Sequence, residues 1–204
     1  MVLPLWYAIL FGLTFILESS LIVYCTRLYP DYSIFSRTIS GLGNPMYKSA
    51  KIFNPTISIM GVILSPLPYY LLQVLPPHWM TSIGIGAFFC SPVGIFLVGI
   101  FHEERQIGHL IAATLGMGGL ITANMVLLYP IFLSSLSNII TAITIISLIT
   151  SIFLAIAGIK NIRTYIPNKR ITKLLYNLNF WEWIQFIILQ VWLGGIYINL
   201  LIAF

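Results

Sequence analysis

Long apolar stretches recur along this chain, and they limit what it can fold into more than any other feature. A transmembrane helix needs about 20 consecutive, mainly apolar residues. Six stretches meet that requirement, at residues 4–26, 54–73, 79–101, 109–129, 137–159 and 180–203. We therefore predict an all-α integral membrane protein, a six-transmembrane-helix bundle.

The composition excludes a soluble protein in which such helices are buried. Of the 204 residues, 59% are hydrophobic and only 7% are charged, and the mean hydropathy is +0.97. The surface of a soluble protein with this composition would be one large apolar patch. The length suits one compact bundle, so we predict a single transmembrane domain over residues 1–204, with no separate soluble domain.

The basic residues lie in alternate loops, which predicts an orientation. Both termini and the even-numbered loops contain no Lys or Arg. All ten basic residues lie in or beside the odd-numbered loops: Arg27, Arg37, Lys48, Lys51, Arg105, Lys160, Arg163, Lys169, Arg170 and Lys173. By the positive-inside rule we expect the odd-numbered loops to be cytoplasmic and both termini outside, in the cell membrane. This bias and the attraction to anionic lipid headgroups explain a pI of about 9.3, so we expect no nucleic-acid partner.

Glu18 is the one acidic residue predicted deep inside a span. It lies about eight residues before the predicted end of the first span, or about 12 Å inside it. A carboxylate at that depth is costly, and it generally faces a partner or a water-filled cavity. Two interpretations remain open: a neutral side chain that is hydrogen-bonded between helices, and a functional group.

The loop between the third and fourth spans is short and polar. It reads His102-Glu103-Glu104-Arg105-Gln106, and Gly108 and His109 follow. The two histidines and a glutamate could bind zinc, or the histidines a haem, but the spacing matches no zinc motif and Gly108 is expected to interrupt the helix. We therefore expect no metal and no cofactor. A polar turn that caps two helices, and a headgroup-binding or acid–base role for Glu103 and His109, both remain open.

The loop after the first span is longer than a tether needs to be. Gly41 and Gly43 predict tight, non-helical turns. Hydroxyl and amide groups surround Arg37, and together they could bind a phosphate or a carboxylate. This loop is interpreted as a plug over the mouth of the bundle, as a ligand-binding loop, or as both.

Three short motifs resemble a known membrane family. Tyr32-Ser33, followed by Ser36-Arg37-Thr38-Ile39-Ser40-Gly41-Leu42-Gly43, is similar to the first-loop signature of the DUF998 family. Ile52-Phe53-Asn54 with Gly61 resembles the start of that family's second span. Gly99-Ile100-Phe101, followed by His109-Leu110-Ile111-Ala112-Ala113, resembles its link between the third and fourth spans, although His102 stands where relatives tend to have proline.

The resemblance implies a six-helix membrane protein of a family whose function is unknown. That family is distantly similar to the Frag1/DRAM/Sfk1 group, whose members are linked to lipid handling and membrane organisation. The resemblance to DUF998 nominates six functional residues: Ser40, Gly41, Leu42, Gly43, Asn54 and His109.

Together, the residues and the resemblance give one set of candidate ligand-binding positions, which share one face of the membrane apart from Glu18. The set is Glu18, Arg37, Ser40, Gly41, Gly43, Asn54, Glu103, His109 and Glu182, the last of which opens the sixth span. We predict a protein that binds or organises membrane lipid through this face. One alternative is an accessory subunit with a membrane protein partner. Another is a membrane enzyme acting on a lipid, with Glu18, Glu103 or His109 as acid–base groups, but the sequence contains no recognisable catalytic pair and we assign no catalytic residue.

Overall fold

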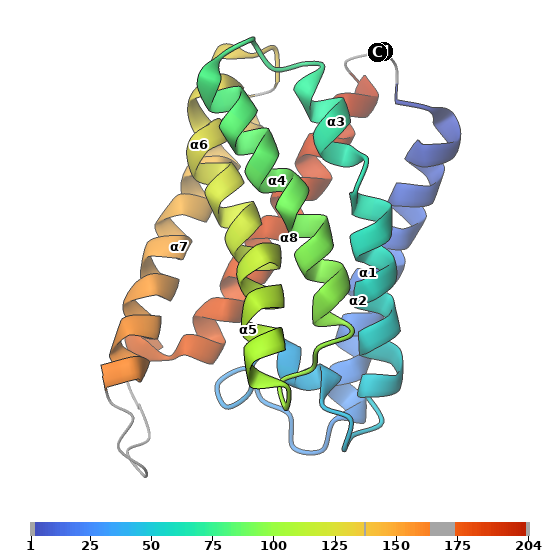
Figure 1. Cartoon of the computed structure of the whole chain (residues 1–204), viewed down its shortest axis with the longest axis vertical. Helices are drawn as coiled ribbons and strands as arrows, with labels where there is room; N and C mark the ends of the chain where they lie inside the picture. The colour runs from blue at the N-terminus through green and yellow to red at the C-terminus, as the bar shows by residue number, and fades with distance from the viewer. Residues whose placement is uncertain (1–2, 137, 164–173, 203–204) are drawn as a thin grey trace.

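The computed structural model describes residues 3–136, 138–163 and 174–202. Every regular element within these residues is a helix, and six segments are long and apolar enough to cross a membrane (Figure 1). They are Leu5–Leu28, Ala50–Leu72, Trp79–Val98, Gln106–Leu133, Asn138–Lys160 and Leu178–Ile202. The predicted all-α, multi-pass integral membrane protein is confirmed. The predicted bounds differ from these by a few residues, and the predicted ends at 137 and 203 lie outside the described residues.

Two of the six spans are not continuous α-helices. The second span consists of α2, Ala50–Leu64, and α3, Leu67–Leu72, and the break falls at Pro66, which has no backbone N–H to donate. The fourth span consists of α5, Gln106–Ala113, the π-helix η2, Thr114–Gly118, and α6, Gly119–Leu133. The remaining spans are the continuous helices α1, Leu5–Leu28; α4, Trp79–Val98; α7, Asn138–Arg163; and α8, Leu178–Ile202.

The expectation that Gly108 interrupts a helix is wrong. Gly108 lies inside α5, and the interruption comes earlier, between the end of α4 at Val98 and the start of α5 at Gln106. One glycine lowers helix stability by only about 1 kcal/mol, which packing against a neighbouring helix readily outweighs. Phe101 packs directly beside Gly108, where an added Cβ would lie 3.0 Å from its ring.

The first and third loops meet at one end of the bundle, which we call the polar end and define by residues 29–49 and 99–105. Helix α1 begins and α8 ends at the opposite end, and the first loop runs beneath the helices beside the start of α5 (Figure 1). This arrangement agrees with the alternating basic loops. Lys169, Arg170 and Lys173 lie outside the described residues, and the side chain of Arg163 is not described either. Which face of the membrane the polar end occupies stays a prediction.

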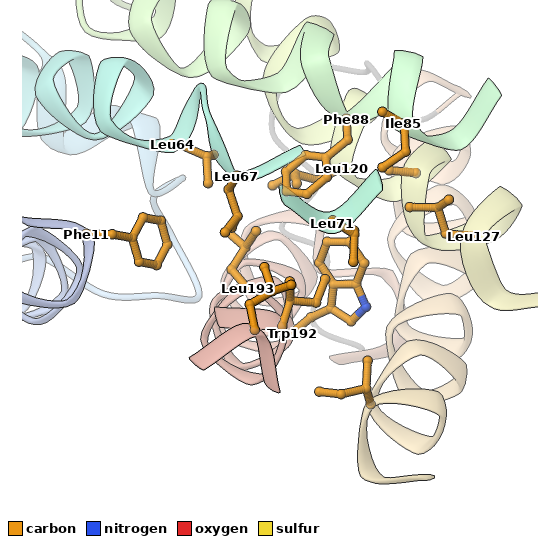
Figure 2. Close-up of a cluster of buried hydrophobic side chains, with 14 of the residues drawn as sticks. Phe11, Leu64, Leu67, Leu71, Ile85, Phe88, Leu120, Leu127, Trp192 and Leu193 are labelled. Atoms are coloured by element: carbon orange, nitrogen blue, oxygen red, sulfur yellow. The ribbon is translucent and has the colours of Figure 1, made fainter. Parts of the chain in front are cut away.

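The half of the bundle away from the polar end has a dense apolar core. Figure 2 shows Trp192 of α8 lying near Leu71, Phe88 and Leu193, and the rings of Phe88 and Trp192 are 5.6 Å apart. The indole N–H of Trp192 donates to Thr144 Oγ1 at 2.9 Å, so no polar group of the ring is left unpaired. Large apolar side chains such as Ile107, which is 78% exposed, cover the outside of the helices, as lipid contact requires.

Candidate functional site

A cavity of about 750 Å³ lies between this core and the polar end. Its walls are mainly apolar, and they come from α2, α4, η2, α6 and α8. The larger apolar residues in them include Phe53, Ile57, Met60, Ile95, Val98, Met117, Ile121, Phe186 and Leu189. Small-molecule pockets in proteins usually measure about 300–1,000 Å³ and are lined mainly by apolar side chains. The cavity therefore has the size and the walls of a ligand site.

Polar side chains gather where the cavity meets the polar end. The first loop, the third loop and the first turns of α5 and α8 supply them: Thr38, Ser40, Glu103, Gln106, His109 and Glu182. Glu18 and Gln190 line the cavity farther in. Gln190 follows Glu182 by eight residues on α8, which is about 12 Å along a helix. The lining thus has a polar end, apolar walls and one polar pair deep in the bundle.

Glu103 joins the first loop to the third. The hydroxyls of Thr38 and Ser40 both donate to Glu103 Oε1, and the Ser40 distance is 2.9 Å. Ser40 begins the short 3₁₀-helix η1, Ser40–Gly43, so the expectation of non-helical turns at Gly41 and Gly43 is wrong. Glu182 of α8 lines the same end of the cavity as Ile39 and Ser40. One short piece of loop therefore lies beside two carboxylates from different elements.

Gly41, Gly43 and Asn54 fasten this loop to the bundle. Asn54 Nδ2 donates to the carbonyl oxygen of Gly43 at 3.1 Å. A Cβ added at Gly43 would overlap Asn54 Oδ1, and one added at Gly41 would lie 3.1 Å from Thr38 Oγ1. None of these three residues lines the cavity, so they position the loop and do not face a ligand there.

The first loop is also fixed to α8. Trp183 Nε1 donates to the Tyr32 hydroxyl at 2.8 Å, and that hydroxyl donates to the Thr38 carbonyl at 3.0 Å. Burial raises the pKa of Tyr32, and the negative charges of Glu182 and Glu103 act in the same direction. Asn177 Nδ2 adds a bond to the Phe35 carbonyl at 2.9 Å. The loop therefore covers the polar end of the cavity as a plug, and it places Thr38 and Ser40 inside.

His109 lines the cavity from α5 and has a defined tautomer. Its Nδ1 lies 2.7 Å from the carbonyl oxygen of Phe101. Because a carbonyl oxygen only accepts, Nδ1 must hold the proton, which leaves Nε2 as the ring nitrogen available to a ligand. His102 does not line the cavity, and its buried Nδ1 finds no hydrogen-bond partner within the described part of the chain.

Glu18 is both hydrogen-bonded between helices and part of the cavity wall. Its side chain is 2% exposed, and Gln190 Nε2 lies 3.2 and 3.1 Å from its two oxygens. Glu18 is therefore hydrogen-bonded between α1 and α8, its neutral state stays a prediction, and the bond does not exclude contact with a ligand. Gln190 Oε1 is buried and accepts from no group among the described residues.

Arg37 does not face the cavity. Its side chain is exposed, and its guanidinium carbon lies 5.9 Å from the centre of the Tyr29 ring. The structure thus divides the nine candidates into cavity-lining residues, loop-positioning residues and Arg37. The lining group comprises Glu18, Ser40, Glu103, His109 and Glu182.

Sequence reasoning missed part of the lining. Thr38 lies two residues before Ser40 in the same polar stretch, and Gln106 closes the polar run of the third loop, so both had a detectable signal. Gln190 was not among the nine candidates. The apolar walls had no signal in the sequence, because a Phe or Met that faces a cavity has the same neighbours in sequence as one in a packed core. Among the described residues, no group of three or more His, Cys, Asp or Glu side chains is placed to hold a metal ion.

Residues 12–198 match the family model described as "Protein of unknown function (DUF998)". The matched region contains every polar residue that lines the cavity. No curated protein and no solved structure matches the chain.

Proposed function

The chain belongs to the DUF998 family, and from the lining of its cavity we propose that it binds one amphipathic membrane molecule. The apolar part of that molecule occupies the space between α2, α4 and α8. Its headgroup lies at the polar end, against Ser40, Glu103 and Glu182. A bound lipid, or a single-chain amphiphile of similar shape, has this division between a polar head and an apolar tail.

The proposal rests on one observation: apolar residues and polar residues border the same continuous cavity. The same cavity of about 750 Å³ is bordered by Met60 and Leu193 in the apolar half of the bundle and by Glu103 at the polar end. A purely polar metabolite would leave the apolar walls uncovered, and a purely apolar molecule would place no polar group against the carboxylates. An amphiphile satisfies both.

Access from the membrane supports the same proposal. Leu110 of α5 lines the cavity and is also 66% exposed on the lipid-facing surface. Leu154 of α7 borders the cavity as well. Helix α5 packs mainly against α4, and it has no comparable packing against α7. An amphiphile can therefore reach the cavity from the bilayer between α5 and α7, without passing through water.

A second candidate function is acid–base chemistry on the bound amphiphile. One observation favours it: Glu103, Glu182 and His109, from three different segments, line the same end of one cavity. General acid–base catalysis needs such groups within hydrogen-bonding reach of the reacting atoms. This function predicts a changed headgroup after incubation, which binding alone does not.

Photo-crosslinking in native membranes tests the proposal. A phospholipid with a diazirine in its acyl chain is incorporated and irradiated, and the labelled peptides are identified by mass spectrometry. We expect labelling within residues 53–64 and 113–121, competed by excess unlabelled lipid. Labelling confined to the outer surface of α7, at residues 145–152, would contradict binding in the cavity. A co-purified protein crosslinked over the polar end, with no lipid label inside, would instead favour the accessory-subunit alternative.

A further inference from the structure

We propose that the headgroup bound at the polar end of the cavity is a protonated amine, and this inference rests on the proposed function. The cavity presents carboxylates and other acceptors to its occupant. The described lining contains no Lys or Arg that could pair with those carboxylates. The occupant would therefore be an amphiphile that brings its own positive charge and its own hydrogen-bond donors.

The acidic side chains come from three separate elements and enclose one space. Glu18 comes from α1, Glu103 from the third loop and Glu182 from α8. None of the described residues that line the cavity is Lys or Arg, and His109 is the one lining residue with a titratable nitrogen. The arrangement is thus a property of the cavity wall and not of a single loop.

The groups that satisfy these carboxylates inside the protein are neutral. Glu103 receives hydroxyl hydrogens from Thr38 and Ser40 on Oε1, and Glu182 lines the cavity beside the same piece of loop. The two carboxylates line the same end of the cavity, so their negative charges repel each other. A cation placed between them would be attracted to both, and the low dielectric of the bundle interior strengthens that attraction.

The polar end offers acceptor atoms to an occupant. Glu103 Oε2 is not used by Thr38 or Ser40. In its neutral form, His109 offers the Nε2 lone pair, because its Nδ1–H donates to the Phe101 carbonyl. A primary ammonium has three N–H donors and no acceptor, so it complements this wall. A phosphate, which only accepts when ionised, does not.

A metal ion fits less well than an organic cation. The described residues hold no group of three or more metal-ligating side chains, and the cavity of about 750 Å³ is bordered by apolar walls. Arg37, the residue expected from the sequence to bind an anion, lies outside the lining. The formal net charge of the chain is +5, so its overall field repels cations, and any preference for them must arise locally.

Three probes with the same chain test the inference: dodecylamine, dodecyl maltoside and dodecyl phosphate. Each is titrated below its micelle concentration into the full-length protein in a bulky neutral detergent, and apparent affinity is taken from the shift in thermal unfolding. We expect dodecylamine to bind at least about tenfold more tightly than dodecyl maltoside, and dodecyl phosphate to bind most weakly.

The variants Glu103→Gln and Glu182→Gln should each reduce dodecylamine affinity about tenfold and leave dodecyl maltoside affinity unchanged. Glutamine keeps an oxygen that accepts from Thr38 and Ser40, so the loop attachment is preserved. Glu104→Gln is the matched control, because Glu104 is exposed and does not line the cavity; it should behave as wild type. Equal affinity for the three probes, or an equal loss in Glu104→Gln, would overturn the amine inference while amphiphile binding stands. Binding of none of the probes would overturn the proposed function as well.

Discussion

Gly43 illustrates how a single position can be fixed by a neighbour far away in the sequence. Glycine there was expected to permit an unusual backbone turn, yet none of the described glycines has a positive φ. The restriction is steric, since an added Cβ would overlap Asn54 Oδ1 and lie 3.1 Å from the Phe53 ring. The sequence indicated the right residue, but the reason for it comes from the packing of the first loop on α2.

We predict that Gly43→Ala lowers the free energy of unfolding by about 1–3 kcal/mol, the usual range for overpacking. Thermal unfolding of the purified protein in neutral detergent measures the effect. Gly86→Ala is the control, because a Cβ there meets nothing within 4 Å; it should leave stability unchanged or raise it slightly. A Gly43→Ala variant as stable as Gly86→Ala would show that the loop is not held as described.

Thr38 and Ser40 show where reasoning from neighbouring residues fails. Next to Arg37 in the sequence, their hydroxyls were expected to help bind an anion. They donate instead to Glu103, which lies 65 and 63 residues away. Proximity along the chain identified the right polar residues as functional candidates. Which charged group their hydroxyls bind is decided by the contact between the first and third loops.

At the scale of elements, the first loop is an attached segment, and its internal hydrogen bond from the Tyr32 hydroxyl to the Thr38 carbonyl needs a protonated tyrosine. Burial raises the pKa of Tyr32 above its ordinary value of about 10. Above pH 10 an unfolded chain releases this proton while the folded chain keeps it, so the unfolded state binds fewer protons and stability falls as pH rises. Below pH 10 both states are protonated, and Tyr32 adds no pH dependence.

We therefore predict that the melting temperature of the wild type falls more steeply between about pH 9.5 and 11 than that of Tyr32→Phe. Phenylalanine fills the same space and has no proton to release. Tyr69→Phe, at a tyrosine that is 42% exposed, serves as the control and should retain the wild-type slope. Parallel pH profiles for wild type and Tyr32→Phe would argue against the buried, bonded hydroxyl.

The π-helix η2 depends on a close crossing with α4. A Cβ added at Gly94 would overlap the backbone of Gly116, and Gly116 also lines the cavity. Small residues allow membrane helices to approach this closely. The structure thus pairs Gly116 with Gly94 on another helix.

Replacing Gly94 with alanine should separate α4 from η2, lowering the free energy of unfolding by about 1–3 kcal/mol. Gly118→Ala, in the same π-helix, is the control, because its Cβ would lie 3.7 Å from Thr114 Cγ2 in ordinary contact. Thermal unfolding in detergent compares the two. Equal melting temperatures for the two variants would contradict the claim that η2 depends on this close contact with α4.

For the whole molecule, the apolar stretches were sufficient to predict the class, the six spans and the meeting of the first and third loops at one end. They were not sufficient to predict the cavity. Its volume depends on α5 packing mainly against α4 while α8 carries Glu182 and Phe186 on the other side. Such distances between helices are set by side-chain packing over the entire bundle, and no periodicity in one segment encodes them.

The central claim is that an amphiphile occupies this cavity, and a cavity-filling variant tests it most directly. Ala113 lines the cavity, whereas Ala142 of α7 is exposed on the outer surface. Native mass spectrometry of gently extracted wild type, Ala113→Phe and Ala142→Phe would compare their bound lipid. We predict one retained amphiphile per chain in wild type and Ala142→Phe, and its loss from a folded Ala113→Phe. Equal retention in all three proteins, or no specific retention in wild type, would contradict the account.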